Sequence, residues 1–135
     1  ANEGAALLAT IYTGSSEFIC LRNGLHGRTK LTMSMTGIGM WRTDPNPVGG
    51  ISFAPNPYCY RCPLGKTYPE CDLACANAVE DIIKTNTSGK VAAFFAEPIQ
   101  GNAGIITPPP GYFQRLKEIL DKYKKSDIIM MVSRK

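Results

Sequence analysis

Apolar residues recur with the period of an α-helix in two segments of the chain. In residues 72–85 and again in residues 112–123, apolar side chains return every three or four positions, which places them on one helix face. An Ala/Leu-rich stretch at 5–12, followed by Thr13 and Gly14, and a short segment at 29–36 are also predicted helices. The two predicted core faces comprise Cys75, Val79, Ile82 and Ile83, and Phe113, Leu116, Ile119, Leu120 and Tyr123.

Short apolar runs alternate with these helices. Residues 91–96 read Val-Ala-Ala-Phe-Phe-Ala, which is typical of a buried strand, and residues 17–22 and 127–132 are further predicted strands. The alternation of helix and strand predicts an α/β fold. Residues 37–69 are rich in Gly, Pro and Asn without a period, so we expect a functional or packed loop. Taken alone, the chain is expected to expose strand 91–96 as an aggregation-prone edge.

Length and charge exclude several function classes. The 135 residues suffice for one small domain, and the net charge of +4 is mild. Lys and Arg are scattered, without a basic stripe interleaved with aromatic residues, so nucleic-acid binding is not expected. No apolar run has the length of a membrane span and no targeting segment is visible. We therefore expect no membrane association and a cytoplasmic location, or a mitochondrial one in a eukaryote.

Polar side chains follow the apolar strand at 91–96. Glu97 comes directly after it, Pro98 stops further strand pairing, and Gln100 adds an amide. In open α/β sheets, ligands bind outside the carboxyl ends of the strands, so these positions are candidates for chemistry. The competing interpretation is a solvated carboxylate that only caps the strand.

Four cysteines form two close pairs. Cys59 and Cys62 make a C-x-x-C motif, and Cys71 and Cys75 follow at a spacing that could supply four thiolates to zinc. A disulfide between Cys59 and Cys62 is a second interpretation, and free thiols are the default. Cys20 lies in a predicted strand and is expected to be part of the core.

Four motifs in order resemble the large domain of class III (omega-type) aminotransferases, which use pyridoxal 5'-phosphate. They are A-N-E at 1–3, L-R-N-G-L-H-G-R-T at 21–29, A-E-P-I-Q-G at 96–101 and P-P-P-G-Y at 108–112. The resemblance covers residues 1–123 and implies the central portion of a fold-type I large domain, a mixed, mostly parallel sheet flanked by helices, incomplete here. Residues 124–135 are expected to be a divergent C-terminal tail.

The resemblance implies cofactor-binding roles for Leu25, His26, Gly27 and Glu97. In the family, an aromatic residue before His-Gly stacks on the cofactor ring, and here Leu25 offers a smaller apolar contact. His26 belongs to the wall of the active site in the family, although a buried structural histidine is the alternative. The segment that precedes the position of Ala1 in the family holds the cofactor phosphate at a helix N-terminus.

Gln100 and Asn102 fall in the substrate pocket by the same resemblance. Ornithine and 4-aminobutyrate aminotransferases carry a Glu at the position of Asn102, so its absence favours the alanine–glyoxylate or omega-amino-acid:pyruvate type. The implied reaction moves an amino group between an amino acid and a 2-oxo acid such as pyruvate or glyoxylate. The implied assembly of the full-length parent is a homodimer.

Two groups that this chemistry requires have no match in the chain. A pyridoxal-phosphate transaminase needs a Schiff-base Lys and an acidic residue at the pyridinium nitrogen. No lysine lies in the expected context, and Asp127 comes before the last predicted strand instead of after it. We therefore expect no catalytic residue in this chain and no turnover by the chain alone. The alternative function is a small non-catalytic α/β module stapled by zinc on Cys59, Cys62, Cys71 and Cys75.

Overall fold

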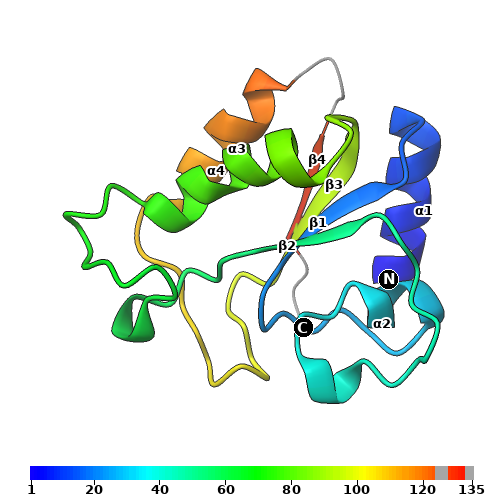
Figure 1. Ribbon diagram of the computed structural model, residues 1–135, viewed down its shortest axis with the longest axis horizontal. Helices are drawn as coiled ribbons and strands as arrows, with labels where there is room; N and C mark the ends of the chain where they lie inside the picture. Colours follow the sequence, from blue (N-terminus) through cyan, green and yellow to red (C-terminus); the bar gives the residue numbers. More distant parts are fainter. Residues whose placement is uncertain (124–127, 133–135) are drawn as a thin grey trace.

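The computed structural model describes residues 1–123 and 128–132, in which helices and strands alternate (Figure 1). The predicted position Asp127 lies outside the described residues. The elements follow in the order α1 (Asn2–Thr13), β1 (Glu17–Leu21), α2 (Lys30–Ser34), η1 (Gly39–Trp41), β2 (Ile51–Ala54), η2 (Cys59–Arg61), α3 (Ala74–Asn86), β3 (Val91–Ala96), α4 (Tyr112–Lys122) and β4 (Ile129–Val132). The predicted α/β class is confirmed.

The four described strands form one sheet in the order β2-β1-β3-β4, and all neighbours are parallel. Strand β2 lies inside the segment 37–69 that was expected to be a loop, so that expectation is wrong for Ile51–Ala54. Its residues pair with β1, with Ile19 opposite Ser52 and Leu21 opposite Ala54. Strand β3 is paired on both sides, so the expected exposed edge at 91–96 is also wrong.

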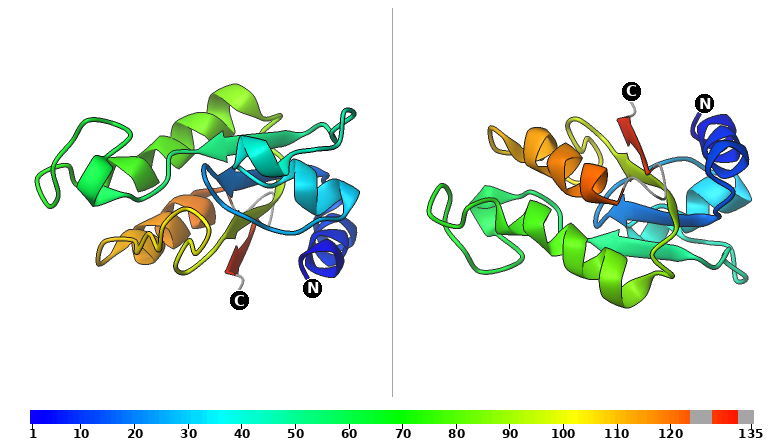
Figure 2. Two further views of the ribbon diagram at one scale, coloured as in Figure 1. Left: turned by 90° about the horizontal axis from the view of Figure 1, so that it is seen from below. Right: turned by 90° about the horizontal axis from the view of Figure 1, so that it is seen from above.

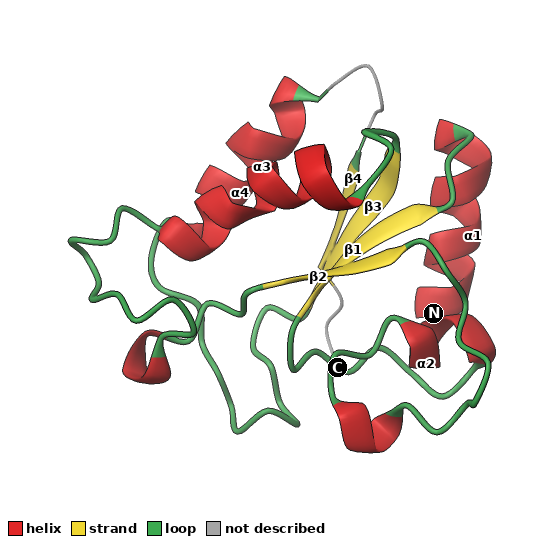
Figure 3. Cartoon of the chain, viewed as in Figure 1, coloured by secondary structure: helices red, strands yellow, loops and turns green. Residues whose placement is uncertain are grey.

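Helices cover both faces of the sheet, which gives three layers (Figures 2 and 3). On one face, α3 and α4 pack on Ile19, Leu21 and Phe94. On the other, α1 packs on Phe18, Cys20 and Phe95. The alternation of these strand residues between faces follows from the two-residue period of a strand.

The amphipathic faces that the sequence predicts are the ones that the structure buries. Val79 and Ile83 of α3 and Leu116 and Leu120 of α4 are at most 2% exposed. Cys20 is completely buried in β1, as expected for a core cysteine. None of the helices in residues 1–123 and 128–132 has the length and apolarity needed to cross a membrane.

Candidate active-site edge

The loops that follow β1 and β3 lie side by side, because these strands are parallel neighbours and end at the same edge of the sheet. Glu97 follows β3 and is only 2% exposed. Its Oε1 accepts a hydrogen bond from the backbone N–H of Leu25 at 2.8 Å, and its Oε2 accepts one from the N–H of Gly101 at 3.4 Å. The interpretation of Glu97 as a solvated strand cap is therefore wrong, because the carboxylate is buried and joins the two loops.

The loop after β1 is anchored to the start of α1. The side-chain amide of Asn2 donates a hydrogen bond to the carbonyl of His26 at 2.8 Å, and Glu3 and Thr29 are also hydrogen-bonded. The His26 side chain is buried, and its ring lies edge-on to Phe95 with ring centroids 6.0 Å apart. The first turn of α1 therefore lies at the same edge as the predicted cofactor residues.

Two glycines make this loop arrangement sterically feasible. A Cβ on Gly27 would lie 2.6 Å from Oγ1 of Thr32, and the φ of Gly27 is 148°. A Cβ on Gly37 would lie 2.6 Å from the carbonyl oxygen of Leu21, at the end of β1. Sequence reasoning missed Gly37, because a glycine after the predicted helix at 29–36 signals a helix end and not a close approach to the end of β1.

Thr36 is a second residue at this edge that the sequence did not single out. Its Oγ1 accepts a hydrogen bond from the backbone N–H of His26 at 3.2 Å and donates one to the carbonyl of Thr32 at 2.9 Å. Because the side chain is fully buried, these bonds fix the backbone of the predicted cofactor loop against α2. No sequence motif marks such a side chain-to-backbone bond.

The two predicted substrate-pocket residues have different surroundings. Gln100 is fully buried, and its Nε2 donates a hydrogen bond to the carbonyl of Arg22 at 2.9 Å. Its Oε1 is buried without a hydrogen-bond partner among the described residues. Asn102 is exposed in the turn that follows. A substrate role for either residue stays a prediction.

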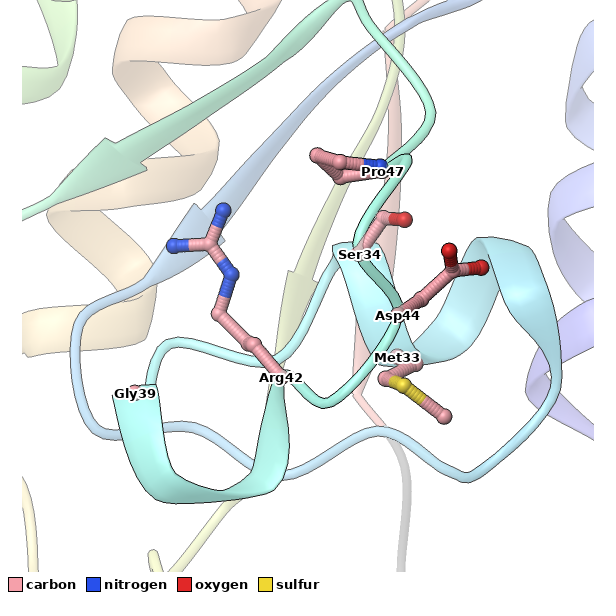
Figure 4. Close-up of a pocket in the computed structure, with 6 residues that line it drawn as sticks. All are labelled: Met33, Ser34, Gly39, Arg42, Asp44 and Pro47. Atoms are coloured by element: carbon pink, nitrogen blue, oxygen red, sulfur yellow. The ribbon is translucent and has the colours of Figure 1, made fainter.

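A cavity of about 200 Å³ lies beside α2 and contains none of the predicted site residues (Figure 4). Met33 and Ser34 line it from α2, and Arg42 and Asp44 line it from the following loop. Asp44 forms an ion pair with Lys30 at 3.4 Å, and the backbone N–H of Asn46 together with Lys30 lowers the pKa of the Asp44 carboxyl.

The four clustered cysteines surround a small cavity between the loop after β2 and the start of α3, and none of the predicted cofactor residues lines it. All four are free thiols. Within the described part of the chain, no group of three or more His, Cys, Asp or Glu side chains is arranged to hold a metal ion. The structure therefore does not support the zinc-stapled module, and a Cys59–Cys62 disulfide is not formed in it.

Comparisons with known proteins agree with the motifs at this edge. The sequence model of the family described as aminotransferase class-III matches residues 1–132. The leucine/methionine racemase of Thermococcus litoralis is 37% identical over 129 residues, which is 91% of this chain and 28% of the racemase. The diaminobutyrate–2-oxoglutarate aminotransferase of Haemophilus influenzae is 35% identical over 135 residues, which is 98% of this chain and 29% of that enzyme.

Solved structures show the same relationship. An amine transaminase from an uncultivated Pseudomonas species, in its PLP-bound form, superposes with a TM-score of 0.88 at 31% identity. The match covers 98% of this chain and 31% of that one, so the chain spans less than a third of the length of these relatives. Its fold is part of a fold-type I transaminase large domain. The chain belongs to the class III aminotransferase family, whose members depend on pyridoxal phosphate.

Proposed function

We propose that this chain is the cofactor-facing part of a transaminase that moves an amino group between an amino acid and a 2-oxo acid such as pyruvate or glyoxylate. The observation that carries the proposal is the convergence of the Leu25–His26–Gly27 loop, the buried Glu97 and the first turn of α1 at one edge of a parallel sheet. This is the edge where open α/β sheets bind ligands.

The donors and surfaces at this edge fit pyridoxal 5'-phosphate. The cofactor combines a flat ring with an anionic phosphate, so its site needs an apolar wall and N–H donors. Leu25 is half-buried and apolar, and Asn2 in the first turn of α1 is hydrogen-bonded to its loop. By the resemblance, the segment that precedes Ala1 in the family would supply the helix N-terminal N–H groups that attract the phosphate. Gln100 also presents a buried oxygen without a partner among the described residues, beside the Glu97 loop.

The residues at this edge would each help to position the bound cofactor. Leu25 would bound one face of the ring, while the Asn2–His26 contact keeps the loop in register with α1. Glu97 would hold the loop in place through the Leu25 N–H, and its carboxylate gives the edge a negative charge. When bound, the cofactor supplies an electron sink for the α-carbon of the amino acid.

Asn102 supports a proposal for the class of amino acceptor. Asn102 is neutral and exposed where the resemblance places a Glu in the ornithine and 4-aminobutyrate enzymes. We therefore propose a small 2-oxo acid acceptor. We also propose a homodimer for the full-length parent. The strongly exposed Leu8 and Ile11 on α1 support a surface that packs against further protein.

The experiment replaces the matching segment of the Haemophilus influenzae diaminobutyrate–2-oxoglutarate aminotransferase with this chain. Amino transfer by the chimera is measured with pyruvate, glyoxylate and 2-oxoglutarate as acceptors, beside the parent enzyme and the isolated chain. We expect transfer by the chimera and none by the isolated chain above the rate of free pyridoxal phosphate, because the isolated chain lacks the required Lys and Asp. A folded chimera that binds the cofactor without transferring amino groups would contradict the proposal, and so would turnover by the isolated chain.

A further inference from the structure

The cavity beside α2 is a binding space that the proposed cofactor edge does not use. Its volume is about 200 Å³, and none of the predicted cofactor-binding residues lines it. A water molecule takes up about 30 Å³ of the liquid, so the cavity has room for about six water-sized groups. Three of its lining residues, Gly39, Arg42 and Pro47, are exposed, so a small molecule in solution can reach it.

Arg42 supplies a positive charge to this cavity. Its guanidinium lies over the ring of Phe53 in β2, with Cζ 5.3 Å from the ring centroid. Within the part of the chain that the structure describes, Arg42 forms no ion pair with a carboxylate. The aromatic ring orients the guanidinium but accepts none of its conventional hydrogen bonds, so its N–H donors can bind a carboxylate ligand.

Asp44 supplies a negative charge to the same cavity. Figure 4 shows its carboxylate and the Arg42 guanidinium on either side of Ser34. Its Oδ1 accepts a hydrogen bond from the backbone N–H of Asn46 at 2.8 Å, and its Oδ2 lies 3.4 Å from Nζ of Lys30. A carboxylate offers about four acceptor positions, so these two contacts leave room for an ammonium group.

The two opposite charges restrict the kind of ligand that fits. A phosphate dianion attracted to Arg42 would be repelled by Asp44, and a simple cation attracted to Asp44 would be repelled by Arg42. An α-amino acid carries a carboxylate and an ammonium group and can satisfy both residues. Met33 and Pro47 add apolar lining that suits a short side chain, and the volume of the cavity suits an amino acid of the size of alanine or serine.

We propose that this cavity binds a small α-amino acid as a zwitterion, with its carboxylate on Arg42 and its ammonium group on Asp44. The site is distinct from the proposed cofactor edge and requires no cofactor. It lies on the segment that anchors that edge, because Ser34 at the end of α2 lines the cavity and Thr36, two residues later, accepts the hydrogen bond of the His26 backbone N–H.

The test titrates the folded, isotope-labelled chain with L-alanine in the absence of pyridoxal phosphate and follows the backbone amides by NMR. We expect saturable shifts at Ser34, Gly39 and Asp44 with a millimolar dissociation constant, whereas Leu25 and Gly101 at the proposed cofactor edge should not shift. Propionate and ethylamine each retain one of the two charged groups of alanine and should bind about tenfold more weakly. Because neither cofactor nor amino transfer enters the test, its outcome is independent of the proposed function.

Two variants make the assignment specific. Arg42→Gln and Asp44→Asn each remove one charge and should each weaken alanine binding about tenfold. Arg61→Gln is the matched control and should leave the affinity unchanged, because Arg61 also lies over an aromatic ring, that of Tyr60, but does not line the cavity.

Three results would each overturn the proposal. They are the absence of shifts around the cavity in excess alanine, equal affinities for alanine and propionate, and an unchanged affinity in Arg42→Gln. The comparison of alanine with propionate uses the unmodified chain, so it decides the question even if a variant fails to fold.

Discussion

The carboxylate of Glu97 accepts a hydrogen bond from the backbone N–H of Leu25 at 2.8 Å, across 72 positions of sequence. Through this bond, the residue that follows β3 holds the loop that follows β1. The loop carries the Leu25–His26–Gly27 motif, so the position of the proposed cofactor wall depends on a carboxylate in a different segment. Glu97 is thus a positioning residue whatever further contact it makes with a bound group.

Removing this carboxylate should destabilise the chain. Glu97→Ala leaves the N–H groups of Leu25 and Gly101 without their acceptor, which should lower the free energy of unfolding by about 1–3 kcal/mol. Glu97→Gln retains one acceptor oxygen and should cost less. Urea denaturation followed by circular dichroism measures both. The control is Asn102→Ala at an exposed position, and its free energy of unfolding should stay within about 0.5 kcal/mol of that of the wild type. If Glu97→Ala is as stable as the wild type, the carboxylate does not hold the two loops together.

Gly37 should be intolerant of a side chain. A Cβ there would lie 2.6 Å from the Leu21 oxygen and 2.8 Å from the Asn23 nitrogen, so Gly37→Ala must push the turn after β1 outward. We expect a loss of about 1–3 kcal/mol, as for other overpacked sites. Gly39→Ala is the matched control, because nothing lies within 4 Å of its added Cβ. Similar denaturation midpoints for the two variants would show that the backbone approach is looser than described.

The outer face of α1 should drive self-association of the isolated chain. Leu8 and Ile11 are 68% and 70% exposed on this helix, whereas Ala9 is 1% exposed. Leu8→Lys combined with Ile11→Lys should shift the chain toward monomer in sedimentation velocity while leaving its circular dichroism unchanged. Ala9→Lys should instead unfold the chain, because it buries a charge against the sheet. If the double variant associates as strongly as the wild type, another surface is responsible.

Alkaline pH should destabilise the folded chain in part through Cys75. Burial raises the pKa of Cys75 to about 11, and the Cys59 and Cys71 thiols add to the shift. A thiol in the unfolded chain titrates near about 8.5. The folded state therefore holds this proton more tightly, and the stability it contributes at neutral pH is lost as the pH rises from about 8.5 to about 11.

The measurement is the urea midpoint from pH 8 to pH 11 for the wild type and for Cys75→Ala. Cys20 and Tyr112 also have raised pKa values because of burial, and they remain in both proteins. Between pH 8 and pH 11, Cys75→Ala should therefore lose less stability than the wild type, because only the contribution of Cys75 is removed. Parallel pH profiles would mean that Cys75 titrates as it does in the unfolded chain.

The parts of the fold that the sequence predicts are those with a strong local signal. The bounds of β3 agree with the prediction because an unbroken apolar run ends at a charged residue, Glu97. Strand β2 was missed because Ile51–Ala54 is short and has little periodicity of its own. It becomes a strand by pairing with β1, where Phe18 lies opposite Ile51. Tertiary pairing of this kind cannot be read from a local pattern.

The residues of the candidate site were likewise predicted only where the sequence carries a local signal. Glu97 could be identified from its place after an apolar strand, because the direction of parallel strands sends such residues to the ligand-binding edge. The hydrogen-bond partner of Glu97 could not be identified from the sequence, because the donor is the backbone N–H of Leu25, which has no side-chain signature. The burial of Gln100 and its bond to the Arg22 carbonyl were also hidden, since the sequence indicated only that Gln100 falls in the substrate pocket by resemblance.

In the proposed function, Leu25 faces the cofactor ring, and a gain of affinity tests this placement without damaging the fold. Leu25→Tyr restores the aromatic side chain that the family places there, in the chimera with the Haemophilus influenzae enzyme described above. Stacking contributes about 0.5–1.5 kcal/mol, so the pyridoxal phosphate dissociation constant, measured by fluorescence titration, should fall about two- to tenfold. The exposed position Asn102→Tyr is the control and should leave it unchanged. An unchanged or weaker affinity in Leu25→Tyr would contradict the placement of this loop against the cofactor.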